Sequence, residues 1–131
     1  MEIQTPTGVL KNRIYSLAPL NFIKDLKEAI SYVEKKYEGK TRFNGVPMIN
    51  HVLEIAISLL EKGLDLNTSI ATLLHEIELN GLIEEEIRNL FSDDVMGILN
   101  GIKKIKRGTD SVDTNPELII KYVLNVSEDL R

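Results

Sequence analysis

The stretch that decides the fold is Thr72-Leu73-Leu74-His75-Glu76-Ile77-Glu78-Leu79-Asn80, the most apolar helical segment that also places a histidine beside a carboxylate. The chain has only two histidines, and the other one, His51, lies 24 residues upstream on a second apolar helical stretch. An antiparallel pair of helices would bring the two imidazoles and the Glu76 carboxylate together. Histidine and carboxylate side chains are common ligands of divalent metals. The pattern therefore indicates a candidate metal site at His51, His75 and Glu76, although the residues alone favour two half-buried histidines that are hydrogen-bonded between packed helices.

Apolar residues recur at three- and four-residue steps along most of the chain, which is typical of helices that bury one face. The expected helices cover residues 22–38, 48–62, 68–79, 83–91, 93–105 and 116–126, with the third at the centre because it is apolar on most sides. Asn21, Asn67 and Ser92 are the expected N-caps of three of them.

The remaining segments contain residues typical of turns, or their apolar residues show no helical period. Residues 1–20 are interpreted as an N-terminal extension, a mobile start with about one helical turn, because Pro6, Gly8 and Pro19 interrupt them. Residues 106–114 are polar and predict a loop. No segment shows the alternation of apolar and polar residues that is typical of a β-strand. The prediction is an all-α bundle of about six helices, with one domain over residues 21–131.

Composition limits the classes of function. The 131 residues are 43% hydrophobic and 27% charged, the balance of an ordinary globular domain. A net charge of −4 argues against non-specific binding to nucleic acid or to an anionic membrane, which needs a basic surface. With no cysteine, neither a disulfide framework nor a thiolate metal site is possible. The N-terminus lacks the features of a signal peptide, and no apolar run reaches the roughly 18 residues of a membrane span, so we expect a cytoplasmic protein.

An ordered set of motifs resembles the N-terminal HD-type hydrolase domain of the RelA/SpoT family, whose members make and degrade the alarmone (p)ppGpp. Residues 42–51 are similar to the family's Arg-Lys-x-Gly-x-Pro-Tyr-x-x-His segment, and residues 71–76 to its Ala-Ala-Leu-Leu-His-Asp core. The resemblance covers residues 22–131 and implies an HD-domain-like helical bundle. The further matching segments are 63–65, 83–91, 100–105 and 128–131.

The resemblance also implies a metal centre and shows where this chain departs from it. The family holds manganese with two histidines, the aspartate after the second, and an aspartate on a later helix. His51 and His75 match the histidines, Glu76 stands in place of the first aspartate, and the chain stops at Arg131, before the later helix. We expect a domain without its last helices, with at most three protein ligands. Manganese would then bind weakly, and no bound metal is the leading expectation.

The family's catalytic pair is replaced as well. A Glu-Asp pair activates water in the family, and the matching positions here are Leu79 and Asn80, neither of which can act as a general base. The resemblance implies nucleotide contacts at Arg42, Asn44 and Lys104. We therefore expect a degenerate, catalytically silent phosphohydrolase domain with a regulatory or structural role. The alternatives are an active manganese-dependent (p)ppGpp 3′-pyrophosphohydrolase and a helical dimerisation module. The expected partners are a guanosine nucleotide and either a second copy or a synthetase domain in a longer parent chain.

Overall fold

The computed structural model describes residues 5–42 and 44–107, with side chains described as far as Lys103. These residues contain six α-helices, one 3₁₀ turn and no strand, apart from an isolated antiparallel bridge between Thr41 and Pro47. The all-α prediction is confirmed. The elements are α1 (Pro6–Leu17), η1 (Leu20–Phe22), α2 (Ile23–Lys36), α3 (Met48–Glu61), α4 (Leu66–Leu74), α5 (Gly81–Leu90) and α6 (Asp93–Arg107).

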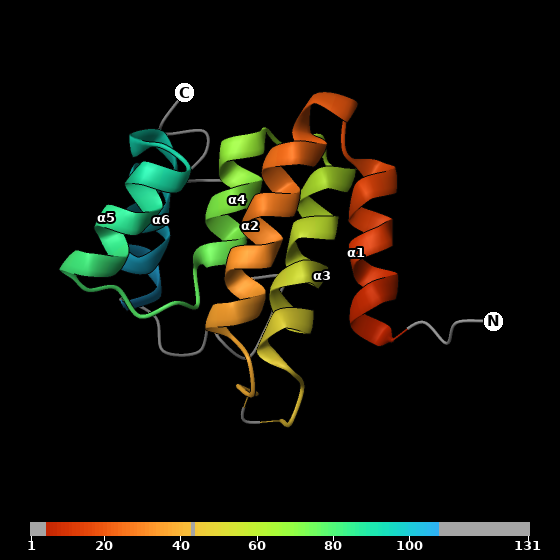
Figure 1. Cartoon of the computed structure of the whole chain (residues 1–131), viewed down its shortest axis with the longest axis horizontal. Helices are drawn as coiled ribbons and strands as arrows, with labels where there is room; N and C mark the ends of the chain where they lie inside the picture. The colour runs from red at the N-terminus through yellow and green to blue at the C-terminus, as the bar shows by residue number, and fades with distance from the viewer. Residues whose placement is uncertain (1–4, 43, 108–131) are drawn as a thin grey trace.

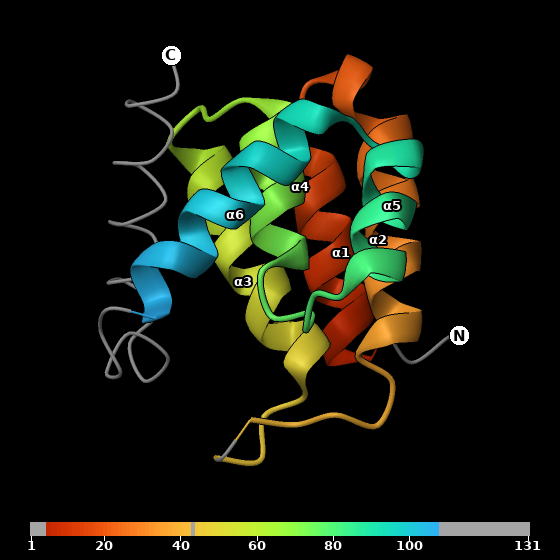
Figure 2. The same cartoon turned by 90° about the vertical axis from the view of Figure 1, so that its left-hand side faces the viewer.

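Helix α4 lies at the centre of the bundle, as the sequence predicts. It packs against α2, α3 and α6, while α1 covers α3 and α5 packs on α6 (Figures 1 and 2). All of α4 except its first two residues is buried, and Leu73 and Leu74 are fully so. The residues that α4 holds at its C-terminal end are thereby fixed between three other helices.

The N-terminal segment is helical, so the prediction of a mobile start with about one helical turn is wrong for residues 6–17. Thr5 caps α1 by accepting the Gly8 N–H at 3.0 Å, and Pro6 stands in the first turn, where a proline favours a helix. Ile14 is fully buried where α1 packs along α3. The division of domains at residue 21 stays a prediction.

Two of the three predicted N-caps are wrong. Asp65, and not Asn67, caps α4, because its carboxylate accepts the Thr68 hydroxyl at 2.7 Å and the Thr68 N–H at 3.4 Å. Asn21 lies within the 3₁₀ turn η1 instead of capping α2. Ser92 does cap α6, since its hydroxyl accepts the N–H of residue 95 at 3.1 Å.

Two helix ends also differ from the prediction. Helix α4 stops at Leu74 although the apolar period runs on to residue 79, and α6 continues to Arg107, past the expected start of a loop at residue 106. The rest of that predicted loop and the expected helix 116–126 lie outside the described residues. None of the helices in the described ranges is both long and apolar enough to cross a bilayer.

Candidate metal site

Two helix ends bring the histidines together. Helices α3 and α4 are joined by residues 62–65, with Gly63 at a φ of +77°, so the start of α3 lies beside the end of α4. His51 is in the first turns of α3 and is 3% exposed, and His75 is the C-cap of α4 and is 1% exposed. Their ring centroids are 5.9 Å apart. The sequence prediction that an antiparallel pair would join them is confirmed.

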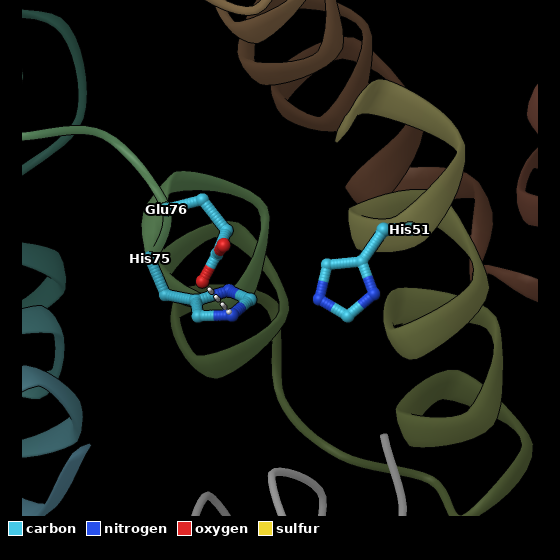
Figure 3. Close-up of side chains that lie close together, drawn as sticks. All are labelled: His51, His75 and Glu76. Atoms are coloured by element: carbon cyan, nitrogen blue, oxygen red, sulfur yellow. Dashed lines mark ion pairs between the residues drawn. The ribbon is translucent and has the colours of Figure 1, made fainter. Parts of the chain in front are cut away.

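Glu76 completes a group of three metal-ligating side chains. One ligand atom from each of His51, His75 and Glu76 lies within 4.8 Å of the others. The Glu76 carboxylate folds back toward the His75 ring, and the His51 ring stands opposite on α3 (Figure 3). The Glu76 side chain is only 10% exposed, so its charge is largely removed from water.

The His75 ring is held in one tautomer. Its Nδ1 lies 2.5 Å from the carbonyl oxygen of Thr72, which can only accept, so Nδ1 carries the hydrogen. In the neutral ring, Nε2 then keeps its lone pair. Metal-binding histidines commonly donate the other ring N–H to a carbonyl in this way.

The other nitrogen of His75 lacks a hydrogen bond. Nε2 lies 3.0 Å from Oε1 of Glu76, close enough for an ion pair if the ring is protonated, yet the direction of approach makes no hydrogen bond. Nε2 is thus a fully buried nitrogen without a hydrogen-bond partner among the described residues. A buried nitrogen lone pair this close to a carboxylate favours a cation or a proton near both groups. The donor set therefore fits a divalent metal.

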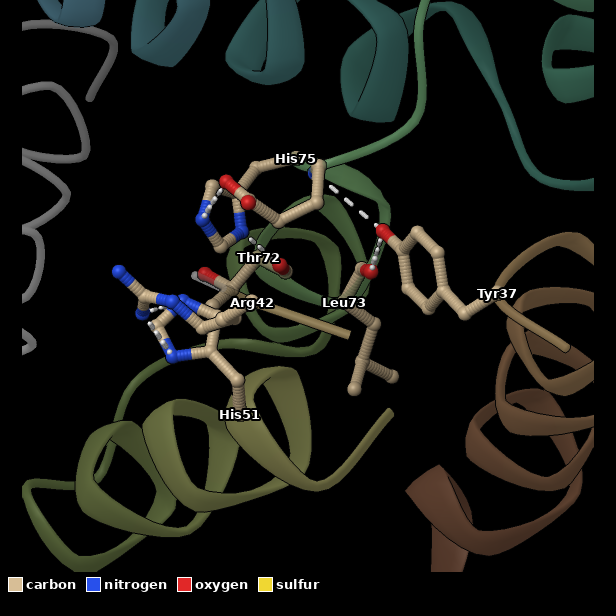
Figure 4. A network of polar contacts seen from close by, with 7 residues as sticks. Tyr37, Arg42, His51, Thr72, Leu73 and His75 are labelled. Atoms are coloured by element: carbon tan, nitrogen blue, oxygen red, sulfur yellow. Dashed lines mark hydrogen bonds and ion pairs between the residues drawn. The ribbon is translucent and has the colours of Figure 1, made fainter. Parts of the chain in front are cut away.

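Tyr37 joins the site from the end of α2, a role that the sequence did not reveal. Its hydroxyl donates to the Leu73 carbonyl at 2.8 Å and accepts the Glu76 N–H at 3.2 Å (Figure 4). Burial raises the pKa of the Tyr37 phenol well above its usual value, and the charge of Glu76 adds to the effect, so the phenol stays neutral. No local signal in the sequence identifies the partners of this hydroxyl.

Arg42 reaches the site from the loop before α3. The loop is closed by hydrogen bonds from the Arg42 N–H to the Val46 carbonyl at 2.8 Å and from the Met48 N–H to the Lys40 carbonyl at 2.9 Å. Nη1 of Arg42 lies 2.6 Å from Nδ1 and 2.9 Å from Nε2 of His51 (Figure 4). A guanidinium is only a donor and a neutral imidazole has one lone pair, so at most one of these two contacts is a hydrogen bond.

The other predicted site residues have different surroundings. Asn44 is exposed, and its side chain accepts the Val46 N–H at 3.1 Å within its own turn. Leu79 is partly buried against the core, and Asn80 caps α5 by accepting the Ile83 N–H at 2.9 Å. Lys104 lies in α6, but its side chain is outside the described residues.

Comparison with known proteins identifies the family of this domain. Residues 29–119 match the family model described as HD domain. The chain is 30% identical over 125 residues to the bifunctional (p)ppGpp synthase/hydrolase SpoT of Escherichia coli strain K12, which covers 93% of this chain and 18% of that protein. It is 32% identical over 108 residues to the guanosine-3′,5′-bis(diphosphate) 3′-pyrophosphohydrolase of Aquifex aeolicus, with 82% of this chain and 15% of the relative covered.

A third relative extends the same pattern. The probable GTP pyrophosphokinase of Mycobacterium leprae is 28% identical over 127 residues, which is 96% of this chain and 16% of that protein. The chain thus spans less than a fifth of the length of these curated relatives. The chain belongs to the HD-domain family, and its domain is of the HD type carried by the RelA/SpoT proteins.

Proposed function

We propose that this domain binds a divalent cation at His51, His75 and Glu76, together with the phosphates of a guanosine polyphosphate, and does not hydrolyse it. The observation that carries the proposal is the buried Nε2 of His75, which has no hydrogen-bond partner in the described part of the chain and lies 3.0 Å from Oε1 of Glu76. Burying His75 Nε2 and the Glu76 carboxylate next to each other would cost free energy unless a cation interacted with both groups.

Each residue would contribute differently to cation binding. The His75 ring is held by its Nδ1–H, Glu76 supplies a negative charge that is mostly shielded from water, and His51 adds a nitrogen from the opposite helix. Nitrogen and oxygen ligands of this kind suit manganese. A bound divalent ion would supply polarisation of a phosphate group and acidification of a bound water. This proposal departs from the leading sequence expectation, which was no metal.

The positions of Leu79 and Asn80 support a silent site. Hydrolysis needs a group that takes a proton from the attacking water. Leu79 has no ionisable group, and the Asn80 side chain is engaged as the cap of α5. Glu76, the carboxylate nearest to the histidines, would be occupied as a ligand. The domain would then recognise its nucleotide without consuming it.

The ligand class rests on the relatives and on Arg42. One relative is named for hydrolysis of guanosine-3′,5′-bis(diphosphate) and another as a GTP pyrophosphokinase. The Arg42 guanidinium stands beside His51, where it could move from the imidazole to a phosphate. We expect a regulatory or structural role in the cytoplasm, beside a second copy or a synthetase domain.

A manganese titration by calorimetry, followed by a (p)ppGpp hydrolysis assay, tests the proposal. We expect one-to-one binding that His75→Ala abolishes and that Glu78→Ala, a change at an exposed carboxylate next to the site, leaves intact. Circular dichroism of each variant establishes that it is folded. No binding up to millimolar manganese would refute the metal site. If the wild-type chain releases pyrophosphate in a manganese-dependent reaction and His75→Ala does not, the claim that the site is catalytically inactive is refuted and the active hydrolase is favoured.

A further inference from the structure

The end of α4 departs from helical geometry at the residue before Glu76. In an uninterrupted α-helix the Glu76 N–H would donate to the Thr72 carbonyl, four residues back. Here the Glu76 N–H donates to the Tyr37 hydroxyl at 3.2 Å, and that hydroxyl donates to the Leu73 carbonyl at 2.8 Å. A phenol from α2 is thus inserted at the point where the ladder of α4 stops.

The backbone around the insertion tightens into a 3₁₀-like turn. The His75 N–H contacts the Thr72 carbonyl at 3.3 Å, and the Ile77 N–H donates to the Leu74 carbonyl at 3.0 Å, both spanning three residues instead of four. The apolar period alone does not explain this early end, because Ile77 continues it and is itself buried.

The inserted hydroxyl determines which donor the Thr72 carbonyl accepts. With the Glu76 N–H taken by Tyr37, this carbonyl accepts Nδ1–H of the His75 ring at 2.5 Å. We propose that Tyr37 is the positioning residue of the site: its hydroxyl holds the Glu76 N–H away from Thr72, so that the His75 ring donates through Nδ1 and keeps Nε2, which lies beside the Glu76 carboxylate, free of a hydrogen. Without the hydroxyl, the helix can extend by one residue, and the Glu76 N–H then competes with the ring for the same carbonyl.

Tyr37 is itself rigidly held. It is 3% exposed, and its N–H donates to the Val33 carbonyl at 2.8 Å at the end of α2. The preceding helix packs on α4, so a shift of the phenol would require a shift of two helices. The metal consequence of this inference rests on the proposed function, whereas the tautomer consequence does not.

The first test needs no metal. In the ¹⁵N-labelled, metal-free chain, long-range ¹H–¹⁵N spectra should show His75 with its hydrogen on Nδ1. In Tyr37→Phe we expect the Nε2–H form to become the major one and the carbon shifts of His75 and Glu76 to become more helical. Tyr32→Phe is the matched control, because it removes a hydroxyl from the same helix that makes a 2.8 Å hydrogen bond to Glu86, on α5. An unchanged His75 tautomer in folded Tyr37→Phe would overturn the inference.

A second measurement uses the wild-type chain and so does not depend on the folding of a variant. The Tyr37 hydroxyl proton should exchange slowly and show a nuclear Overhauser contact with the Glu76 amide proton. Absence of this contact, or a wild-type His75 with its hydrogen on Nε2, would also overturn the inference.

The metal titration then separates this inference from the proposed function. If the chain binds manganese, Tyr37→Phe should weaken binding about tenfold, within the range for residues that orient a ligand, and Tyr32→Phe should not. Unchanged affinity in Tyr37→Phe would contradict the positioning role. If the wild-type chain binds no manganese while the tautomer change occurs, the positioning role stands and the metal site fails.

Discussion

Nη1 of Arg42 lies 2.6 Å from Nδ1 and 2.9 Å from Nε2 of His51, so a side-chain cation lies beside both nitrogens of the imidazole. Whichever nitrogen would bind a metal is already in contact with a positive charge. Arg42 therefore opposes cation binding at His51 by charge repulsion. The same guanidinium would favour the binding of phosphate, which is the role that the sequence predicts for it.

Replacing Arg42 should separate these two effects. In Arg42→Ala we expect manganese affinity without nucleotide to rise about threefold to tenfold, since a unit charge a few ångströms away is removed from a partly buried site. The affinity for ppGpp should fall in the same variant. Lys40→Ala, an exposed change in the same loop, should alter neither. Calorimetry with each ligand measures both values, and weaker manganese binding by Arg42→Ala would contradict the opposing role.

Replacing Glu76 with glutamine should weaken metal binding without loss of stability. Glu76→Gln removes the one charged ligand, so we expect manganese affinity to fall about tenfold or more. In the metal-free chain, the new amide N–H can donate to the lone pair of His75 Nε2, which gains about 1 kcal/mol for a buried acceptor that lacked a partner. Glu78→Gln is the exposed control. Calorimetry and urea unfolding give the two values, and a less stable variant with unchanged manganese affinity would exclude this account.

The gathering of His51, His75 and Glu76 could be predicted because it depends on local signals. Two apolar helical stretches separated by a short connection with a glycine are expected to pack antiparallel, and a histidine near each facing end then meets its counterpart. The early end of α4 could not be predicted in this way. It depends on the hydroxyl of Tyr37, whose bonds to Leu73 and Glu76 span 36 and 39 residues of sequence. A pattern of apolar residues contains no information on such tertiary hydrogen bonds.

The N-terminal helix illustrates a different cause of failure. Pro6 and Gly8 interrupt the pattern, yet a proline in the first turn favours a helix, and Thr5 supplies the cap. Few apolar residues follow, so the period is weak, but Ile14 is fully buried and Leu10 and Tyr15 pack partly buried against the core.

Truncation of Ile14 tests whether α1 is part of the folded unit. In Ile14→Ala we expect a loss of about 2–5 kcal/mol in the free energy of unfolding, the usual cost of a cavity at a fully buried position. Val9→Ala, on the same helix at 48% exposure, should change it by no more than about 0.5 kcal/mol. Urea unfolding measures both. Equal small losses would mean that α1 is not docked as described.

Asn80 should behave as a helix cap. In Asn80→Ala the Ile83 N–H loses its acceptor, and we expect a loss of about 1 kcal/mol in the free energy of unfolding. Asn80→Asp keeps a capping oxygen and places a negative charge at the helix N-terminus, so it should be at least as stable as the wild-type chain. Thermal unfolding of the two variants decides the matter, and equal losses in both would contradict the capping role.

Alkaline pH should destabilise the fold through the buried phenol of Tyr37. Burial, with the charge of Glu76 and then the neighbouring Tyr32, raises the pKa of this phenol well above that of an unfolded chain, near 10. Between these two pKa values the folded chain keeps a proton that the unfolded chain releases. The free energy of unfolding is therefore unaffected below about pH 10 and falls above it, by up to about 1.4 kcal/mol per pH unit for this group. Tyr37→Phe should be less stable at neutral pH but should lose less stability between about pH 10 and 11. Urea unfolding at a series of pH values measures both slopes, and equal slopes in the two chains would mean that the Tyr37 phenol is not buried in its neutral form.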